Sequence, residues 1–232
     1  MVTGAWLISI EGDDLSKDGN VTVTLPKSVD RIRMQDANAR VQSDLTFRVS
    51  ARPASINVLR GRIENGVVIT APAAIAMKST AYLQPLYEFR NARMRLNLRP
   101  DGNLDGTLGG SQPWQPIYWS HAKVGYVDER GFSVDTPGLY YALRGAADGY
   151  PDPKTGENTA ISSAYLIQAV PALVARVDEE RSTVDRQALP KSRNETDEAG
   201  VLSRMNFALF RVSDAESSAG PPLAAQLRCL TL

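Results

Sequence analysis

Two predicted β-hairpins constrain the fold of this chain more than any other feature. The runs 56–63 and 67–70 are rich in β-branched residues and are joined by an Asn-Gly turn. Asn-Gly between two such runs indicates a tight hairpin, because both residues tolerate positive φ. In residues 93–99 apolar and polar side chains alternate strictly, and an Asp-Gly turn leads to the returning run 104–108. The chain is therefore expected to form antiparallel β-structure here.

Further short strands are predicted around these hairpins. Residues 5–10, 21–25 and 43–50 are apolar or alternating runs bounded by turn-forming residues. About seven or eight strands at regular spacing predict an antiparallel β-sandwich or a partly closed barrel over residues 5–108. Residues 72–78 are interpreted as a short helix or a buried connector, without a choice between the two.

The second half of the chain has a different pattern, so the fold class is predicted as α+β and mainly β. Thr136 is expected to cap a helix that has Pro137 at its first position, where a missing N–H costs nothing. Residues 160–177 are apolar and interrupted by Pro171. We interpret them as a helix that ends before the proline, with two short segments as the alternative.

Three regions are predicted. Residues 1–112 form an antiparallel β domain, and residues 113–175 form an aromatic-rich helical segment packed on it. Residues 176–232 form a charged linker, a returning strand and a tail. A chain of 232 residues can bury a substantial core in such an arrangement.

Composition excludes several classes of protein. Lys plus Arg and Asp plus Glu each total 26, so the net charge of zero argues against a strongly basic nucleic-acid binder. The single cysteine, Cys229, excludes an intrachain disulfide, and the single histidine, His121, excludes zinc sites built on histidine pairs. No apolar run approaches the roughly 20 residues that span a bilayer. The expected partner is a glycan or a protein.

Aromatic residues cluster between positions 114 and 150. They are Trp114, Tyr118, Trp119, Tyr126, Phe132, Tyr140, Tyr141 and Tyr150. Such a cluster favours either an aromatic platform for a sugar, planar ligand or protein partner, or a second small core. The prolines that flank Trp114 predict an extended, exposed chain from Trp114 to Trp119. The predicted ligand-binding residues are Trp114, Tyr118, Trp119, Tyr140 and Tyr141.

Two acidic turns could bind a cation. The turn 101–106 has the spacing of an EF-hand calcium loop, but Gln112 replaces the bidentate glutamate, and strands are predicted on both sides. The second candidate metal site consists of Asp148, Asp152, Glu157 and Asn158. Its alternative is a solvated loop in which Asn158 or Thr159 caps a following helix. No cofactor is predicted, and calcium is the one that the sequence leaves open.

Catalytic signals are weak, and no catalytic residue is assigned. No G-x-S-x-G elbow occurs, and adjacent residues such as Ser120 and His121 rarely orient their side chains together. Paired carboxylates could hydrolyse a glycoside, because that reaction needs only two acidic groups on facing elements. The candidates are His121, Asp128, Asp135 and Asp148.

Arginines recur at a spacing of two on predicted strands. The groups are Arg31 and Arg33, Arg60 and Arg62, and Arg93, Arg95 and Arg99. They could line one face of a sheet and bind an anion, or they could form the polar face of a half-exposed sheet. The zero net charge favours the second interpretation.

The sequence therefore predicts a non-catalytic β-rich binding or assembly module that contacts a glycan or protein partner through residues 113–150. One alternative is a hydrolase or lyase that acts on a carbohydrate or ester through tyrosines and carboxylates. Another is a subunit of a larger complex, in which the chain from residue 176 onward wraps a neighbour. Few lysines relative to arginines and many Thr, Asn and Asp turns favour a secreted or periplasmic location. The oligomeric state is left open.

Overall fold

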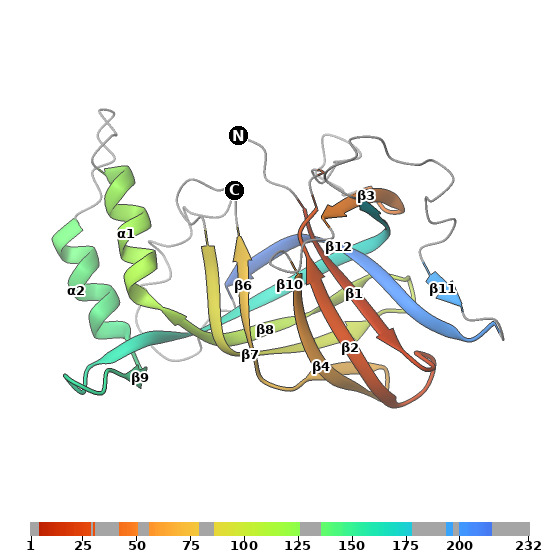
Figure 1. The fold of residues 1–232 in the computed structure, drawn as a ribbon, viewed down its shortest axis with the longest axis horizontal. Coiled ribbons are helices and arrows are strands. Elements are labelled where there is room, and N and C mark those ends of the chain that lie inside the picture. The colour runs from red at the N-terminus through yellow and green to blue at the C-terminus, as the bar shows by residue number, and fades with distance from the viewer. Residues whose placement is uncertain are drawn as a thin grey trace.

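The computed structural model describes residues 5–28, 30, 42–50, 56–78, 86–125, 136–177, 194–196 and 200–214. Within these residues most of the chain is β-strand, with two short helices (Figure 1). The strands are β1 (Trp6–Gly12), β2 (Gly19–Pro26), β3 (Leu45–Ser50), β4 (Ile56–Glu64), β5 (Val67–Thr70), β6 (Ala73–Lys78), β7 (Leu86–Leu98), β8 (Leu104–Pro113), β9 (Gly149–Pro151), β10 (Asn158–Val177), β11 (Asn194–Thr196) and β12 (Leu202–Asp214). The helices are α1 (Trp114–Gly125) and α2 (Thr136–Ala146).

Eight antiparallel strands close into a barrel. Their order is β12-β1-β2-β4-β5-β7-β8-β10, and β10 pairs with β12 to complete the ring. The other described strands are additions: β11 pairs with β12, β6 with β7, β9 with β10, and β3 lies parallel to β10. The mainly β fold class is thus confirmed. Because β10 and β12 are needed for closure, the barrel extends well beyond residue 112.

Both predicted hairpins are present. Strands β4 and β5 are joined by Asn65 and Gly66, whose φ angles of 49° and 76° are the positive values that a two-residue hairpin turn requires. Strands β7 and β8 are joined by the turn that contains Gly102, with a φ of 83°. Local turn chemistry therefore sets the register of two of the eight strand pairings that close the barrel.

The predicted helix at 160–177 is wrong, because these residues lie in the strand β10. From residue 161 to 168 the side chains alternate between the barrel interior and solvent. Ile161, Tyr165 and Ala169 are four residues apart, and a spacing of four keeps residues on one face of a strand as well as of a helix. Pro171 pairs with Phe207 of β12, and its carbonyl accepts a hydrogen bond from the Asp44 N–H at 2.7 Å.

The undecided segment 72–78 is also a strand. Residues Ala73–Lys78 form β6, which pairs with the first half of the long strand β7. Ile75 and Met77 are buried, whereas Ala74 and Ala76 are exposed. This alternation is typical of a half-buried strand and excludes a helix at this position.

Apolar side chains fill the interior of the barrel. Every second residue of each barrel strand points inward, which places Ile10, Val23, Leu59, Leu96 and Ile167 in one continuous core. An eight-stranded barrel has an interior just wide enough for such side chains. The core therefore stabilises the barrel from within.

A second apolar cluster lies on the outside of the barrel, under β3. Phe47 and Val49 of β3 cover Leu7 of β1, Ala172 of β10 and Ala208 of β12. As a result β1 is buried on both faces, although β3 takes no part in barrel closure.

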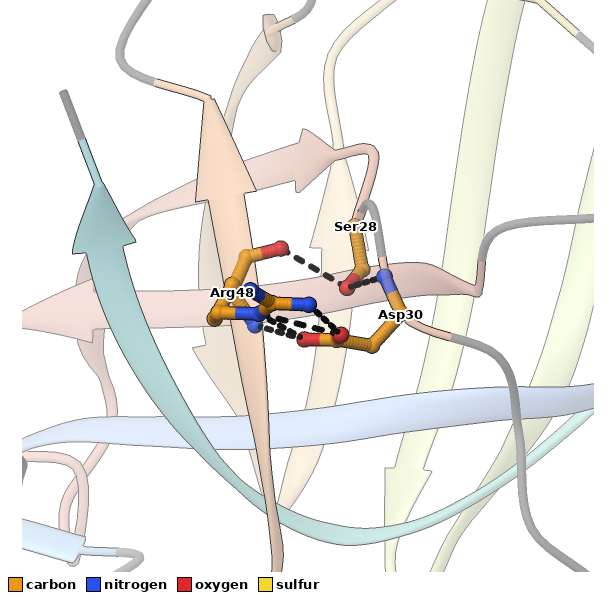
Figure 2. A network of polar contacts seen from close by, with 3 residues as sticks. All are labelled: Ser28, Asp30 and Arg48. Atoms are coloured by element: carbon orange, nitrogen blue, oxygen red, sulfur yellow. Dashed lines mark hydrogen bonds and ion pairs between the residues drawn. The ribbon is translucent and has the colours of Figure 1, made fainter. Parts of the chain in front are cut away.

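A polar network connects β3 to Ser28 and Asp30, in the segment that follows β2 (Figure 2). The Arg48 guanidinium donates to both carboxylate oxygens of Asp30, with Nη2 to Oδ1 at 2.6 Å, and the Arg48 main-chain N–H donates to Oδ2 at 2.7 Å. The buried Ser28 hydroxyl donates to the Arg48 carbonyl at 2.8 Å and accepts from the Asp30 N–H at 2.9 Å. Both carboxylate oxygens of Asp30 and the Ser28 hydroxyl thus have partners, which favours one position for β3.

Candidate functional site

The aromatic segment predicted from the sequence is a pair of packed helices at one end of the molecule (Figure 1). Strand β8 runs directly into α1, which begins at Trp114. The prediction of an extended chain here is wrong, because Pro116 lies in the first turn of the helix. The N–H groups of a first turn have no partner inside the helix, so a proline is tolerated there.

Helix α2 has the start that the sequence predicts. It begins at Thr136, with Pro137 as the next residue. Leu143 of α2 is buried, and α2 contacts both α1 and β10. We call α1 and α2 together the aromatic arm.

Five rings of the aromatic arm form a connected chain of edge-to-face contacts. Tyr140 lies at its centre, with its ring centroid 5.2 Å from that of Trp114, 5.4 Å from Tyr118 and 5.5 Å from Tyr141. Tyr118 in turn contacts Trp119 at 5.1 Å. Edge-to-face pairs at such separations stabilise one another beyond simple burial. All five predicted ligand-binding residues are thus brought together.

The chain of rings runs from the interior of the protein to its surface. Trp114 is only 6% exposed, whereas Trp119 is 60% and Tyr141 is 69% exposed. The expectation that Trp114 is exposed is therefore wrong, because its ring packs beneath Tyr140. Within the described residues its buried indole N–H has no hydrogen-bond acceptor. Trp114 anchors the cluster, and Trp119 and Tyr141 present ring surface to solvent.

An ion pair lies beside the central ring. Arg144 of α2 donates a hydrogen bond to the carboxylate of Glu157, in the turn between β9 and β10. That hydrogen bond is the main reason why the pKa of Arg144 is raised, and the nearby Tyr140 hydroxyl raises it further. Sequence reasoning missed this pair, because nothing in the spacing of the two residues indicates a contact. It places charged hydrogen-bonding groups next to the aromatic surface.

The four residues of the predicted calcium loop are directed to separate partners. Asp148 accepts a hydrogen bond from the Ser162 N–H at 2.8 Å, and Asp152 accepts from two main-chain N–H groups of its own turn. Glu157 is held in the ion pair, and the side-chain amide of Asn158 donates to a main-chain carbonyl after α2. Among the described residues no group of three or more acidic, His or Cys side chains could hold a metal ion. Calcium binding here stays a prediction that requires these groups to exchange partners.

The carboxylates of the turn 101–106 are also engaged locally. Asp101 accepts from the main chain and side chain of Asn103, and the main-chain N–H bond is the main cause of its lowered pKa. Asp105 accepts from Arg99 at 2.5 Å, which is the main cause of its lowered pKa. These contacts are the ones expected of a hairpin turn.

The candidate catalytic residues do not form a described constellation. Asp128 and Asp135 lie outside the described residues, and only the helical main chain of His121 is described. The neighbouring Ser120 donates its hydroxyl to the Ile117 carbonyl at 2.8 Å within α1. Asp148 is held by β10, as described above. A hydrolase or lyase stays an untested alternative.

Fold and site together define a closed antiparallel β-barrel that carries a two-helix aromatic arm. In the part of the chain that the structure describes, neither helix is long and apolar enough to cross a membrane. Comparisons with protein-family models, with curated proteins and with solved structures found no match. Any proposal about function therefore depends on the geometry of the site.

Proposed function

We propose that this protein is a non-catalytic binding module that engages a glycan through the exposed rings of its aromatic arm. The observation that carries the proposal is the connected set of five rings, which is anchored at buried Trp114 and ends in exposed Trp119 and Tyr141. Sugars bind to exposed aromatic faces through their C–H groups, while polar groups beside the rings fix their orientation.

Two further features support a glycan over a protein partner. A protein interface usually has a contiguous apolar centre, whereas Trp119 and Tyr141 are the only large exposed hydrophobic residues among the described residues of the arm. Arg144 and Glu157 offer charged hydrogen-bonding groups next to the Tyr140 ring. A secreted or periplasmic location belongs to the same proposal, because it would bring the arm into contact with extracellular polymers.

Electrophoresis in native gels that contain a neutral soluble polysaccharide tests this proposal. A panel of such polymers is compared, and we expect at least one to retard the wild-type protein. The double variant W119A/Y141A should migrate in that gel as it does without polymer, because the ring surface is lost.

The matched control is V58A/L166A, which removes two exposed apolar side chains from the barrel wall. This variant should be retarded like the wild type. Equal retardation of W119A/Y141A and the wild type would contradict the proposal. A third outcome is that no polymer retards the wild type, while a purified protein partner binds the wild type and not W119A/Y141A. That outcome would show that the aromatic arm binds a protein and not a glycan.

A further inference from the structure

Four exposed arginines share the outer face of two barrel strands. On β4 the side chains that alternate with Arg60 and Arg62 are directed toward the barrel interior, so both arginines point outward. The same alternation on β7 directs Arg93 and Arg95 outward. We call these four residues the arginine face.

Strand β5 lies between β4 and β7 and fixes the spacing of the arginine face. Ile69 of β5 pairs with Arg62 on one side and with Arg95 on the other. Residues two apart on a strand are about 7 Å apart, and strands two positions apart in a sheet are about 10 Å apart. The four Cα atoms therefore mark a rectangle of these dimensions, and Ile69 lies in the middle of the side between Arg62 and Arg95. The barrel wall holds this arrangement rigidly, because each of the three strands is paired on both sides.

Most of the arginine face has no acidic partner. Within the described part of the chain Arg60, Arg93 and Arg95 make no ion pair, and Arg62 contacts Glu64 at 2.6 Å. Other surface arginines are bound to carboxylates, namely Arg48, Arg99, Arg144 and Arg204. In a protein of zero net charge, three neighbouring unpaired guanidinium groups create a local positive field that attracts anions.

The surroundings of the arginine face favour one kind of anion. Guanidinium groups bind carboxylate and sulfate through two parallel hydrogen bonds. A peptide cannot add as a strand here, because β4, β5 and β7 have no free edge. The outward-facing residues of 58–62, 67–69 and 93–97 include no aromatic side chain on which a nucleic-acid base could stack. Half-buried Ile69 instead places an apolar side chain between Arg62 and Arg95, and half-buried Val67 follows on the same face, between Glu64 and Asn97.

We propose that the arginine face binds an acidic polysaccharide through its carboxylate or sulfate groups. A sugar ring lies over Ile69, and the anionic groups reach the guanidinium groups on either side. This inference goes beyond the proposed function, because no residue of the aromatic arm takes part in it.

The test is a titration of the full chain into fluorescein-labelled dextran sulfate, followed by anisotropy at fixed ionic strength. We expect saturable binding by the wild type and a loss of about tenfold in affinity for the double variant R93Q/R95Q, since each hydrogen bond to a charged group contributes measurably. Raising the salt concentration should weaken wild-type binding more than variant binding. Labelled neutral dextran should not bind at the arginine face.

The control variant K17Q/K154Q has the same net charge as R93Q/R95Q but alters two exposed turns elsewhere. It should bind dextran sulfate like the wild type. Equal weakening in K17Q/K154Q and R93Q/R95Q would overturn the proposal, because it would show that net charge alone drives binding. Tighter binding to a single-stranded oligonucleotide of matched charge, with the same loss in R93Q/R95Q, would overturn the polysaccharide assignment. Circular dichroism of each variant shows whether it is folded.

Discussion

At the scale of single residues, close main-chain packing explains a position that side-chain patterns leave open. Gly106 of β8 pairs with Leu96 of β7, and a Cβ at this position would lie 2.0 Å from the Arg95 carbonyl oxygen. The contact is with main chain, so no side-chain movement can relieve it. The sequence alone indicates only that Gly106 belongs to a turn with the spacing of an EF-hand calcium loop.

We expect Gly106→Ala to lower the free energy of unfolding by about 2–3 kcal/mol, because β7 and β8 must move apart to admit the methyl group. Chemical denaturation measures the change. Gly19→Ala is the control, because nothing lies within 4 Å of a Cβ added at Gly19. Equal stability of the two variants would contradict this description of the β7–β8 contact.

A second prediction at this scale concerns the loss of stability at low pH. In the turn after β1, Asp14 accepts hydrogen bonds from Lys17 at 2.8 Å and from the N–H and hydroxyl of Ser16. These bonds, with that from Lys17 the largest cause, lower the pKa of Asp14 to about 2. A carboxyl group whose pKa is lower in the folded state stabilises the fold at neutral pH. That contribution is lost as the pH falls from the ordinary range of a carboxyl toward 2.

Carboxyl-carbon NMR titration of Asp14 checks this expectation. Lys17→Met should raise the pKa of Asp14 toward its ordinary value, whereas Lys154→Met should leave it unchanged. An unchanged pKa in Lys17→Met would show that the ion pair does not form in solution.

At the scale of elements, the sequence predicted those elements that local chemistry defines. The two hairpins depend on turn residues with positive φ, and α2 depends on its N-terminal Thr-Pro pair, so all three were found. Strand β10 was mistaken for a helix, because residues four apart share a face in both structures. Only its pairing with β8 and β12, which are distant in sequence, distinguishes the two.

Strand β3 packs on the outside of the barrel and takes no part in its closure. We therefore expect that β3 can open locally while the barrel stays folded. The pairing of β3 with β10 is parallel, and the Arg48–Asp30 network connects β3 to the segment that follows β2. Arg48→Met should accelerate amide hydrogen exchange in residues 45–50 by about three- to tenfold while leaving exchange in β4 unchanged.

Exchange measured by mass spectrometry or NMR gives the comparison. Arg62→Met is the control, since it removes an exposed ion pair from a strand that neighbours hold on both sides. Unaltered exchange of β3 in Arg48→Met would show that the Arg48 guanidinium does not stabilise this strand.

At the scale of the whole molecule, the fold class was predictable from the sequence, but barrel closure was not. Closure depends on the pairing of β12 with β1 and β10, which joins chain segments far apart in sequence. The aromatic residues were predictable as a cluster, and the structure adds their gradient of exposure. Sequence spacing cannot distinguish the buried Trp114 from the exposed Trp119, because burial depends on how α2 packs over α1.

Trp119 and Tyr141 form the exposed ring surface that we propose contacts a glycan. The most direct test is a titration of tryptophan fluorescence with the polysaccharide that retards the protein most strongly in native gels. We predict a saturable shift of the emission to shorter wavelength that is absent in Trp119→Phe and retained in Trp6→Phe, because Trp119 is the exposed indole of the arm. A shift that persists in Trp119→Phe would contradict the account.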